Sequence, residues 1–477
     1  MTNGDNAARP KLPFLAVVAL ISCTLIRPSS GFVDVSGSNH AEEPNNDEHP
    51  SLPSASSQAT EDEYDDDFFP PIADSDDISY FFSTYDLDGL HWALSNIFAL
   101  SPRNPQNNNV NKSIRRELSP KLVSRGGGDN YTTEYKLLHD LEQARYLARV
   151  LKESKPSVAD YFQSTVIPIY EEVLKNIPPL EDLSRTKGLY AFTKADYESG
   201  IGNVYNKALY IETADEINPT WHTQNGGSLL NNQLDFEGIQ NNWFGHGQNS
   251  PTTSTTSIPG ALVVDNLLST SALQTIRQLL LRNTHWYQTK TPLEFGKYVG
   301  SYVDDGLHDP LFLQLAKQLH ESMPRIMKGH ELKYMWAYKY DSEWESGIRL
   351  HADQAAVNVN LWVSLDGADL EVEGFGGGLV VFTAKPPANW DFESYNTNTE
   401  FVIDHLLRPT NFANLTIAHK PNRAVIFDSA LFHETDRYRF KKGYENGRIN
   451  LTLLFGEMKM GDGDDGNAGR AHVGQEL

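Results

Sequence analysis

Apolar residues in the first half of the chain recur at intervals of three and four, which predicts a helical block. The repeat is formed by Leu137, Leu138, Leu141, Ala144, Ala148 and Leu151, and this spacing places side chains on one helix face. A second helix is predicted from Ser157, disturbed at Pro168 and ended before Pro178. We therefore expect a helical domain over 131–223. The Asn-, Gly-, Ser- and Thr-rich stretch 224–256 predicts a linker or long loop.

The second half of the chain has a different pattern, in which short apolar runs are separated by Gly, Asp and Pro. A strand is predicted at 262–264 and a helix at 271–282. Asp309-Pro310 has the residue types of a helix N-cap and first turn. Five further strands are predicted at 334–340, 356–363, 379–382, 424–427 and 449–455. Helices followed by many short strands predict the α+β class, with a strand-rich sandwich or barrel as the core of residues 257–460.

The N-terminus carries an apolar run, Leu12–Ile26, which follows two basic residues and precedes small ones. The run is shorter than the roughly 20 residues that span a bilayer. It predicts a signal peptide over 1–31, cleaved before Phe32, with an uncleaved signal anchor as the alternative. We therefore expect the secretory pathway, in the lumen or as a secreted protein. A plastid presequence is disfavoured because acidic residues follow, and a membrane is expected as a partner only if the apolar segment is retained.

Charge is distributed unevenly along the 477 residues. The net charge is −23, and residues 32–102 hold 16 Asp and Glu but no Lys or Arg. This balance disfavours nucleic-acid binding, which depends on neutralising phosphates. We expect residues 32–130 to form a largely disordered acidic tail, in which 80–100 could form a short docking helix, and 461–477 a disordered C-terminal tail.

Two further sequence features bear on chemistry and modification. Cys23 is the single cysteine, so a disulfide framework, a cysteine-based metal site and thiol catalysis are excluded. Four N-x-S/T sites permit glycosylation in the secretory pathway, at Asn111, Asn130, Asn414 and Asn450. Asn450 lies in a predicted buried strand, so its match is interpreted as accidental.

The candidate chemistry begins at His351-Ala352-Asp353, because residues two apart on an extended chain face the same way. His433 stands at the end of an apolar strand 80 positions after Asp353. Arg448 begins a strand whose alternate residues, Asn450 and Thr452, share its face. Two His and one carboxylate form the ligand set of non-haem Fe(II) sites, which leave positions open. An interior Arg suits the carboxylate of a bound acid. A Zn²⁺ site and an inactive metal site are the alternatives.

With these motifs in order, residues 257–457 resemble the 2-oxoglutarate- and Fe(II)-dependent oxygenases, prolyl-hydroxylase-like members included. Asp265-Asn-Leu-Leu-Ser269 is similar to the family's entry segment, and Gly376-Gly-Gly-Leu-Val-Val-Phe382 to its central strand. A subgroup often linked to tetratricopeptide repeats shares further runs, which are Trp336–Tyr340, Gly347–His351, Val357–Trp362, Asn389–Phe392 and Asn422–Phe427.

The resemblance implies a double-stranded β-helix, or jelly-roll, as the catalytic domain. It implies that His351, Asp353 and His433 bind Fe(II) and that Arg448 binds 2-oxoglutarate. Tyr340 and Thr452 would assist Arg448, and Asn360 or Trp362 would line the same pocket. The implied activity is O₂-dependent hydroxylation of a C–H bond, with release of succinate and CO₂. The substrate would be a protein side chain, such as prolyl, or a small molecule.

The chain departs from the family at two insertions, 385–414 and 437–446. Neither removes a ligand, but both shape the cleft, so the substrates of better-known members do not transfer. The alternative function is a non-catalytic secretory-pathway protein whose β-helix binds a metal structurally.

Overall fold

The computed structural model describes residues 81–82, 84–100, 130–245, 258–303, 306–344, 348–370, 376–387, 390, 395–396 and 398–458. The predicted signal peptide, most of the predicted acidic tail and the C-terminal tail lie outside these residues. Within them, none of the helices has the length and the apolar character needed to cross a bilayer. The description that follows concerns this part of the chain.

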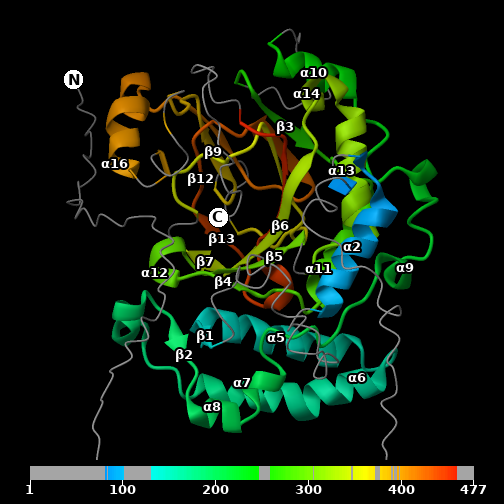
Figure 1. Cartoon of the computed structure of the whole chain (residues 1–477), viewed down its shortest axis with the longest axis vertical. Coiled ribbons are helices and arrows are strands. Elements are labelled where there is room, and N and C mark those ends of the chain that lie inside the picture. The colour runs from blue at the N-terminus through cyan, green and yellow to red at the C-terminus, as the bar shows by residue number, and fades with distance from the viewer. Residues whose placement is uncertain are drawn as a thin grey trace, which may run out of the picture. The chain divides into compact units, whose positions relative to one another are not determined.

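A large antiparallel sheet of seven strands dominates the C-terminal half (Figure 1). Its order is β3-β11-β8-β14-β6-β5-β4. The bounds are Ala261–Asp265 for β3, Arg423–Asp428 for β11, Val357–Trp362 for β8, Ile449–Phe455 for β14, Leu332–Tyr340 for β6, Tyr298–Tyr302 for β5 and Gln288–Thr289 for β4. Four of the five strands predicted after the Asp309-Pro310 helix start therefore lie in this sheet; β6 begins two residues before its predicted start, and β8 is one residue shorter than predicted at each end.

A smaller sheet lies against the first, in the order β10-β9-β12, and His351 extends it by a bridge to His433. Its strands are Asn414–Ile417 for β10, Leu379–Phe382 for β9 and His433–Thr435 for β12. One apolar cluster joins residues of both sheets, among them Val425 and Phe427 of β11 and Val381 of β9. From β8 onward the chain crosses repeatedly between two packed antiparallel sheets, because β9, β10 and β12 lie in the small sheet whereas β8, β11 and β14 lie in the large one. This mixed architecture is consistent with the jelly-roll expected from the sequence.

The two faces of the large sheet differ in chemistry because side chains alternate along each strand. One face of β14 carries Ile449, Leu451 and Leu453, which join the main apolar core with helices α11 and α13. The helices span Thr270–Arg282 and Pro310–Ser322. The opposite face of β14 carries Asn450 and Thr452 toward the small sheet. The predicted alternation is confirmed by these burial partners, and it places polar side chains inside the barrel.

The helical block is built on α5, Glu134–Val150, which is capped by the Thr133 hydroxyl. Its buried face includes Leu137, Leu141 and Ala144 as predicted, but Leu138 is 41% exposed. Lys136 and His139 are buried instead, and both contact Asp140. The spacing of apolar residues along a helix does not predict which polar residues are buried in this way. After α6, Pro156–Tyr161, the helix widens into a π segment, Phe162–Val166, before α7, Ile167–Leu174. The irregular turn directly precedes Pro168, which lacks the amide hydrogen.

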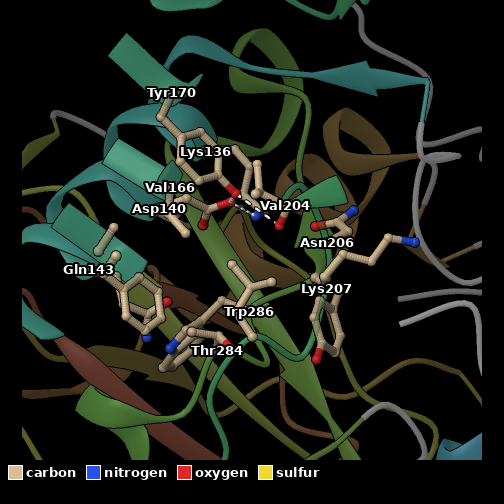
Figure 2. A pocket seen from close by; sticks show the side chains of 14 residues that line it. Lys136, Asp140, Gln143, Val166, Tyr170, Val204, Asn206, Lys207, Thr284 and Trp286 are labelled. Atoms are coloured by element: carbon tan, nitrogen blue, oxygen red, sulfur yellow. Dashed lines mark hydrogen bonds and ion pairs between the residues drawn. The ribbon is translucent and has the colours of Figure 1, made fainter. Parts of the chain in front are cut away.

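A buried ion pair within α5 lines a small hollow between this block and the segment 284–287. Lys136 pairs with Asp140, and the Tyr170 hydroxyl donates to the Asp140 carboxylate at 3.3 Å (Figure 2). Trp286 and Thr284 line the same hollow from the other side. Its free volume of about 20 Å³ suits one or two water molecules. The hollow is therefore a packing defect beside an ion pair, too small for a substrate.

Two segments outside the predicted domains contribute to the main core. The stretch expected to be a linker or long loop contains α10, Phe236–Trp243, in which Ile239 is buried. The Asp235 side chain caps this helix, so a local N-cap signal was present in a polar stretch. Helix α2, Leu87–Leu100, packs against α13 through Leu90 and Leu94, as expected for a docking helix within 80–100.

The remaining short elements connect these layers. The helices are α8 (Lys194–Glu198), α9 (Ala214–Ile217), α12 (Pro292–Phe295), α14 (Pro324–Met327) and α16 (Thr399–Val402). The single turns are η3 (Leu180–Thr186), η4 (Ile201–Asn203), η5 (Gln224–Gly227), η7 (Ile403–Leu407), η8 (Arg408–Thr410) and η9 (Tyr444–Asn446). Two small ribbons pair β1 (Tyr131–Thr132) with β2 (Tyr190–Ala191) and β7 (Glu343–Trp344) with β13 (Tyr438–Arg439).

Candidate metal centre

The three predicted ligands converge at one end of the two sheets. The candidate ligand atoms of His351, Asp353 and His433 all lie within 4.8 Å of one another. Asp353 lies 3.7 Å from Nε2 of His351 through one carboxylate oxygen and 3.5 Å from Nε2 of His433 through the other. The strand bridge between His351 and His433 brings together segments that are 82 positions apart. Such a set can hold one divalent metal.

Backbone carbonyls orient both imidazoles. Nδ1 of His351 lies 2.7 Å from the carbonyl oxygen of Arg349, and Nδ1 of His433 lies 3.0 Å from that of Leu431. A carbonyl only accepts, so each Nδ1 carries the hydrogen and donates. Each Nε2 then presents its lone pair to the third ligand, which is the tautomer that binds a metal.

The electrostatics of the metal-free centre favour neutral imidazole beside a carboxylate. Burial, together with a smaller contribution from the neighbouring His433, lowers the pKa of His351 to about 4. Burial acts to raise the pKa of Asp353, but the hydrogen bond and charge of His433 outweigh it and hold this pKa below its usual value. His351 is therefore neutral and Asp353 is ionised at neutral pH, the states in which these side chains bind a metal.

Asn358 on β8 holds the carboxylate, a role that the sequence motifs did not indicate. Its side-chain amide donates a 2.5 Å hydrogen bond to Oδ2 of Asp353, while Oδ1 of Asp353 is buried without a hydrogen-bond partner in the described structure. Asn358 is fully buried. One oxygen is thus fixed by the protein and the other is left for a ligand, which fits a metal-binding carboxylate.

Arg448 is buried and is anchored by the glycine run. Its Nε donates to the carbonyl of Gly377 at 2.8 Å and its Nη2 to that of Gly378 at 3.4 Å, whereas Nη1 is buried without a partner in the described structure. A Cβ on Gly378 would lie 1.8 Å from the carbonyl oxygen of Ile417. Glycine is therefore required here for the backbone to approach closely.

Aromatic groups with unused donors surround the guanidinium. Its central carbon lies 4.5 Å from the centre of the Tyr340 ring and 5.8 Å from that of Trp362. Tyr438 packs edge-on against Tyr340, with centroids 5.6 Å apart. The Trp362 indole Nε1 and the Tyr438 hydroxyl are both buried without hydrogen-bond partners in the described structure. Together with Nη1 of Arg448, they form a group of unused donors, which suits an anion.

Asn360 and Thr452 are brought to the same inner face, but they bond to each other. The Thr452 hydroxyl donates to Oδ1 of Asn360 at 2.7 Å, and the amide of Asn450 donates to that oxygen at 2.8 Å. The carbonyl oxygen of the Asn450 amide remains buried without a partner among the described residues. The network lies beside the pocket, and direct contact of Asn360 or Thr452 with a cosubstrate stays a prediction.

Other residues weighed from the sequence lie elsewhere. His405 is exposed and hydrogen-bonds the carbonyl of Phe401, while His419 is buried between Asp369 and Ser364. Neither histidine joins the triad. The 437–446 insertion contributes Tyr438 to the pocket, a role that residue spacing alone did not indicate.

Comparisons with known proteins yield structural matches only. No family model matches the chain, and no curated protein matches it. Among solved structures, a 2OG-Fe(II) oxygenase family oxidoreductase from Burkholderia pseudomallei aligns at a TM-score of 0.29 and 10% identity, covering 47% of this chain and 92% of that one. Prolyl hydroxylases are also among the matched structures.

Two other solved structures align over similar shares of this chain. HygX from Streptomyces hygroscopicus, solved with nickel, 2-oxoglutarate and hygromycin B, aligns at a TM-score of 0.30 and 16% identity. The alignment covers 47% of this chain and 88% of that one. The viral collagen prolyl hydroxylase of Paramecium Bursaria Chlorella virus-1, solved with 2-oxoglutarate, aligns at a TM-score of 0.24 and 11% identity. The alignment covers 42% of this chain and 96% of that one. With TM-scores below 0.5, the function of this chain has to be argued from its own site.

Proposed function

We propose that this chain is an Fe(II)- and 2-oxoglutarate-dependent dioxygenase that hydroxylates a C–H bond. The proposal rests on one combination: a His351–Asp353–His433 triad, and a buried Arg448 whose Nη1 has no hydrogen-bond partner in the described structure. A structural metal site explains the triad alone. It does not explain why the interior of the same two-sheet domain buries a guanidinium with one nitrogen left without a partner in the described structure, since burying an unsatisfied charged donor is costly.

The donor set fits the group that the motifs imply. Two imidazole nitrogens and the free oxygen of Asp353 would hold Fe(II), and the donors around Arg448 would hold the far carboxylate of 2-oxoglutarate. Fe(II) with 2-oxoglutarate and O₂ supplies the oxidation, which yields succinate and CO₂ beside the hydroxylated product. The protein contributes orientation: carbonyls fix the imidazole tautomers, Asn358 fixes the carboxylate, and Gly377 and Gly378 aim the guanidinium.

The proposed substrate is a protein side chain, such as prolyl, with a small molecule as the alternative. This choice is supported by the prolyl-hydroxylase-like motif order, and the two insertions weaken any closer transfer. Peptides of varied sequence and small acceptors, assayed for succinate release above the uncoupled rate, would decide between the two classes.

We propose a secretory-pathway location, supported by the N-terminal pattern and by one sequon. Asn414 is exposed at the start of β10, and its Oδ1 accepts a hydrogen bond from the Thr416 hydroxyl at 2.9 Å. Asn450, in contrast, is buried. We expect glycosidase-sensitive mass at Asn414 and none at Asn450. A cytosolic location of the tagged full chain with an intact N-terminus would contradict the proposal.

The test of the activity is an anaerobic titration of the full chain with Fe(II) and 2-oxoglutarate, followed by the weak visible charge-transfer absorption of the chelate. We expect a band that is lost in His351→Ala and in Arg448→Ala, with both variants folded by near-UV circular dichroism. A folded wild type without the band would instead favour a zinc site or the non-catalytic metal-binding protein.

A further inference from the structure

The backbone between the two sequence-adjacent ligands is held on both edges. On one edge, His351 pairs with His433, with N–H···O distances of 3.0 and 2.8 Å. Backbone groups of successive residues in an extended chain point to opposite edges. The amide and carbonyl of Ala352, which is fully buried, therefore face away from β12 and need partners of their own.

Asn396 supplies both partners. The backbone N–H of Ala352 donates to Oδ1 of Asn396 at 3.0 Å, and Nδ2 of Asn396 donates to the carbonyl oxygen of Ala352 at 3.0 Å. The side-chain amide thus replaces a neighbouring strand at one position. Asn396 is only 5% exposed, so water cannot easily take over these bonds.

Asn396 belongs to the insertion 385–414, which the sequence motifs left without a role. The adjacent Tyr395 is buried and packs edge-on against Phe432, with centroids 6.2 Å apart. Leu350 and Ala352 belong to the same apolar cluster. The insertion is therefore packed against the outer side of the ligand-bearing segment, and this packing fixes the Asn396 amide in place.

We propose that Asn396 is a positioning residue of the metal centre. By pairing with Ala352, it fixes the backbone from which His351 and Asp353 project, so that the insertion determines how tightly the centre holds a divalent metal. The inference rests on the part of the proposed function that assigns metal binding to the triad. It does not depend on 2-oxoglutarate or on the substrate.

The test is binding of Co(II) alone to the full-length protein, measured by calorimetry and by the visible ligand-field spectrum. Asn396→Ala is compared with Asn398→Ala, because Asn398 lies in the same insertion and caps α16 through Phe401 without touching Ala352. We expect Asn396→Ala to weaken Co(II) binding by about 10- to 100-fold, the range for lost outer partners of metal ligands, and to alter the spectrum. Asn398→Ala should leave both unchanged, even if it lowers the melting temperature.

Equal Co(II) affinity in Asn396→Ala and wild type would overturn the proposal, as would an equal loss in Asn398→Ala. If Asn396→Ala does not fold, Asn396→Asp decides, since it keeps the acceptor for the Ala352 N–H but loses the donor to the carbonyl. A smaller loss is then expected, and unchanged affinity overturns the idea. If the wild type binds Co(II) but shows no Fe(II)–2-oxoglutarate band, the proposed activity is contradicted, whereas the proposed role of Asn396 in metal binding is not.

Discussion

Tyr438 meets Tyr340 edge to face, with ring centroids 5.6 Å apart. Tyr340 also carries the Arg448 guanidinium on its ring, so one aromatic ring connects a residue of the 437–446 insertion to the predicted cosubstrate arginine. The insertion therefore contributes to the aromatic surroundings of Arg448.

Replacing Tyr438 by Phe should weaken 2-oxoglutarate binding by about tenfold or more, because a hydrogen bond to a charged group contributes about 1.5–3 kcal/mol. The measurement is the 2-oxoglutarate dependence of the charge-transfer band. Binding of 2-oxopentanoate, which lacks the far carboxylate, should not change. Tyr444→Phe is the matched control, since that hydroxyl donates to the Leu281 carbonyl. If Tyr438→Phe weakens the binding of both keto acids equally, the Tyr438 hydroxyl does not contact the far carboxylate directly.

Replacing Asn358 by Ala should lower the affinity for divalent metal by about 10- to 100-fold. The variant removes the donor that fixes Oδ2 of Asp353 and leaves the carboxylate free to rotate. Calorimetric titration with Mn(II), alongside the melting temperature of the metal-free protein, measures the effect. A variant that melts lower but binds Mn(II) as wild type would mean that Asn358 only supports packing.

Acid should destabilise the fold through its buried histidines. Burial lowers the pKa of His285 to about 3, with smaller contributions from His308 and His139, whose own pKa values burial lowers to about 4. The unfolded chain binds these protons near pH 6.5, so the native state binds fewer protons between pH 6.5 and 3. Stability therefore rises with pH across this window and is lost as pH falls.

His285→Leu should remove about 1 kcal/mol of the stability difference between pH 7.0 and 5.5. Urea unfolding at the two pH values measures this difference. His222→Leu is the control, because His222 is more than half exposed. An unchanged difference in His285→Leu would show that this ring does not contribute to the acid sensitivity.

Replacing Lys136 by Met should destabilise the fold by about 3–5 kcal/mol, because it leaves a buried carboxylate without its cation. Asp140 would retain the hydrogen bond from Tyr170 and the contact with Nδ1 of His139 at 3.0 Å. The double variant Lys136→Met/Asp140→Leu should recover much of the loss. Denaturant unfolding of the single and double variants tests this, and equal losses would argue against an uncompensated charge as the cause.

Local sequence patterns predicted much of the architecture. The strands of residues 334–340 and 449–455 and the helix at 271–282 were predictable because apolar residues alternate or recur on one face. The convergence of the candidate triad was predictable because the H-x-D pair and His433 each have a local signature next to a predicted strand. The α10 helix was missed because eight residues with few apolar positions give a weak periodic signal.

The sequence by itself thus determined which residues are candidate ligands, which face of β14 points inward and where the insertions lie. The tertiary structure alone decided which groups remain unpaired and which asparagines support the site. Asn358, Asn396 and Tyr438 have no distinctive spacing, and their roles arise from contacts across 5, 44 and 98 positions. Hydrogen bonds depend on distance in space, and sequence periodicity reports only the orientation of each residue within its own helix or strand.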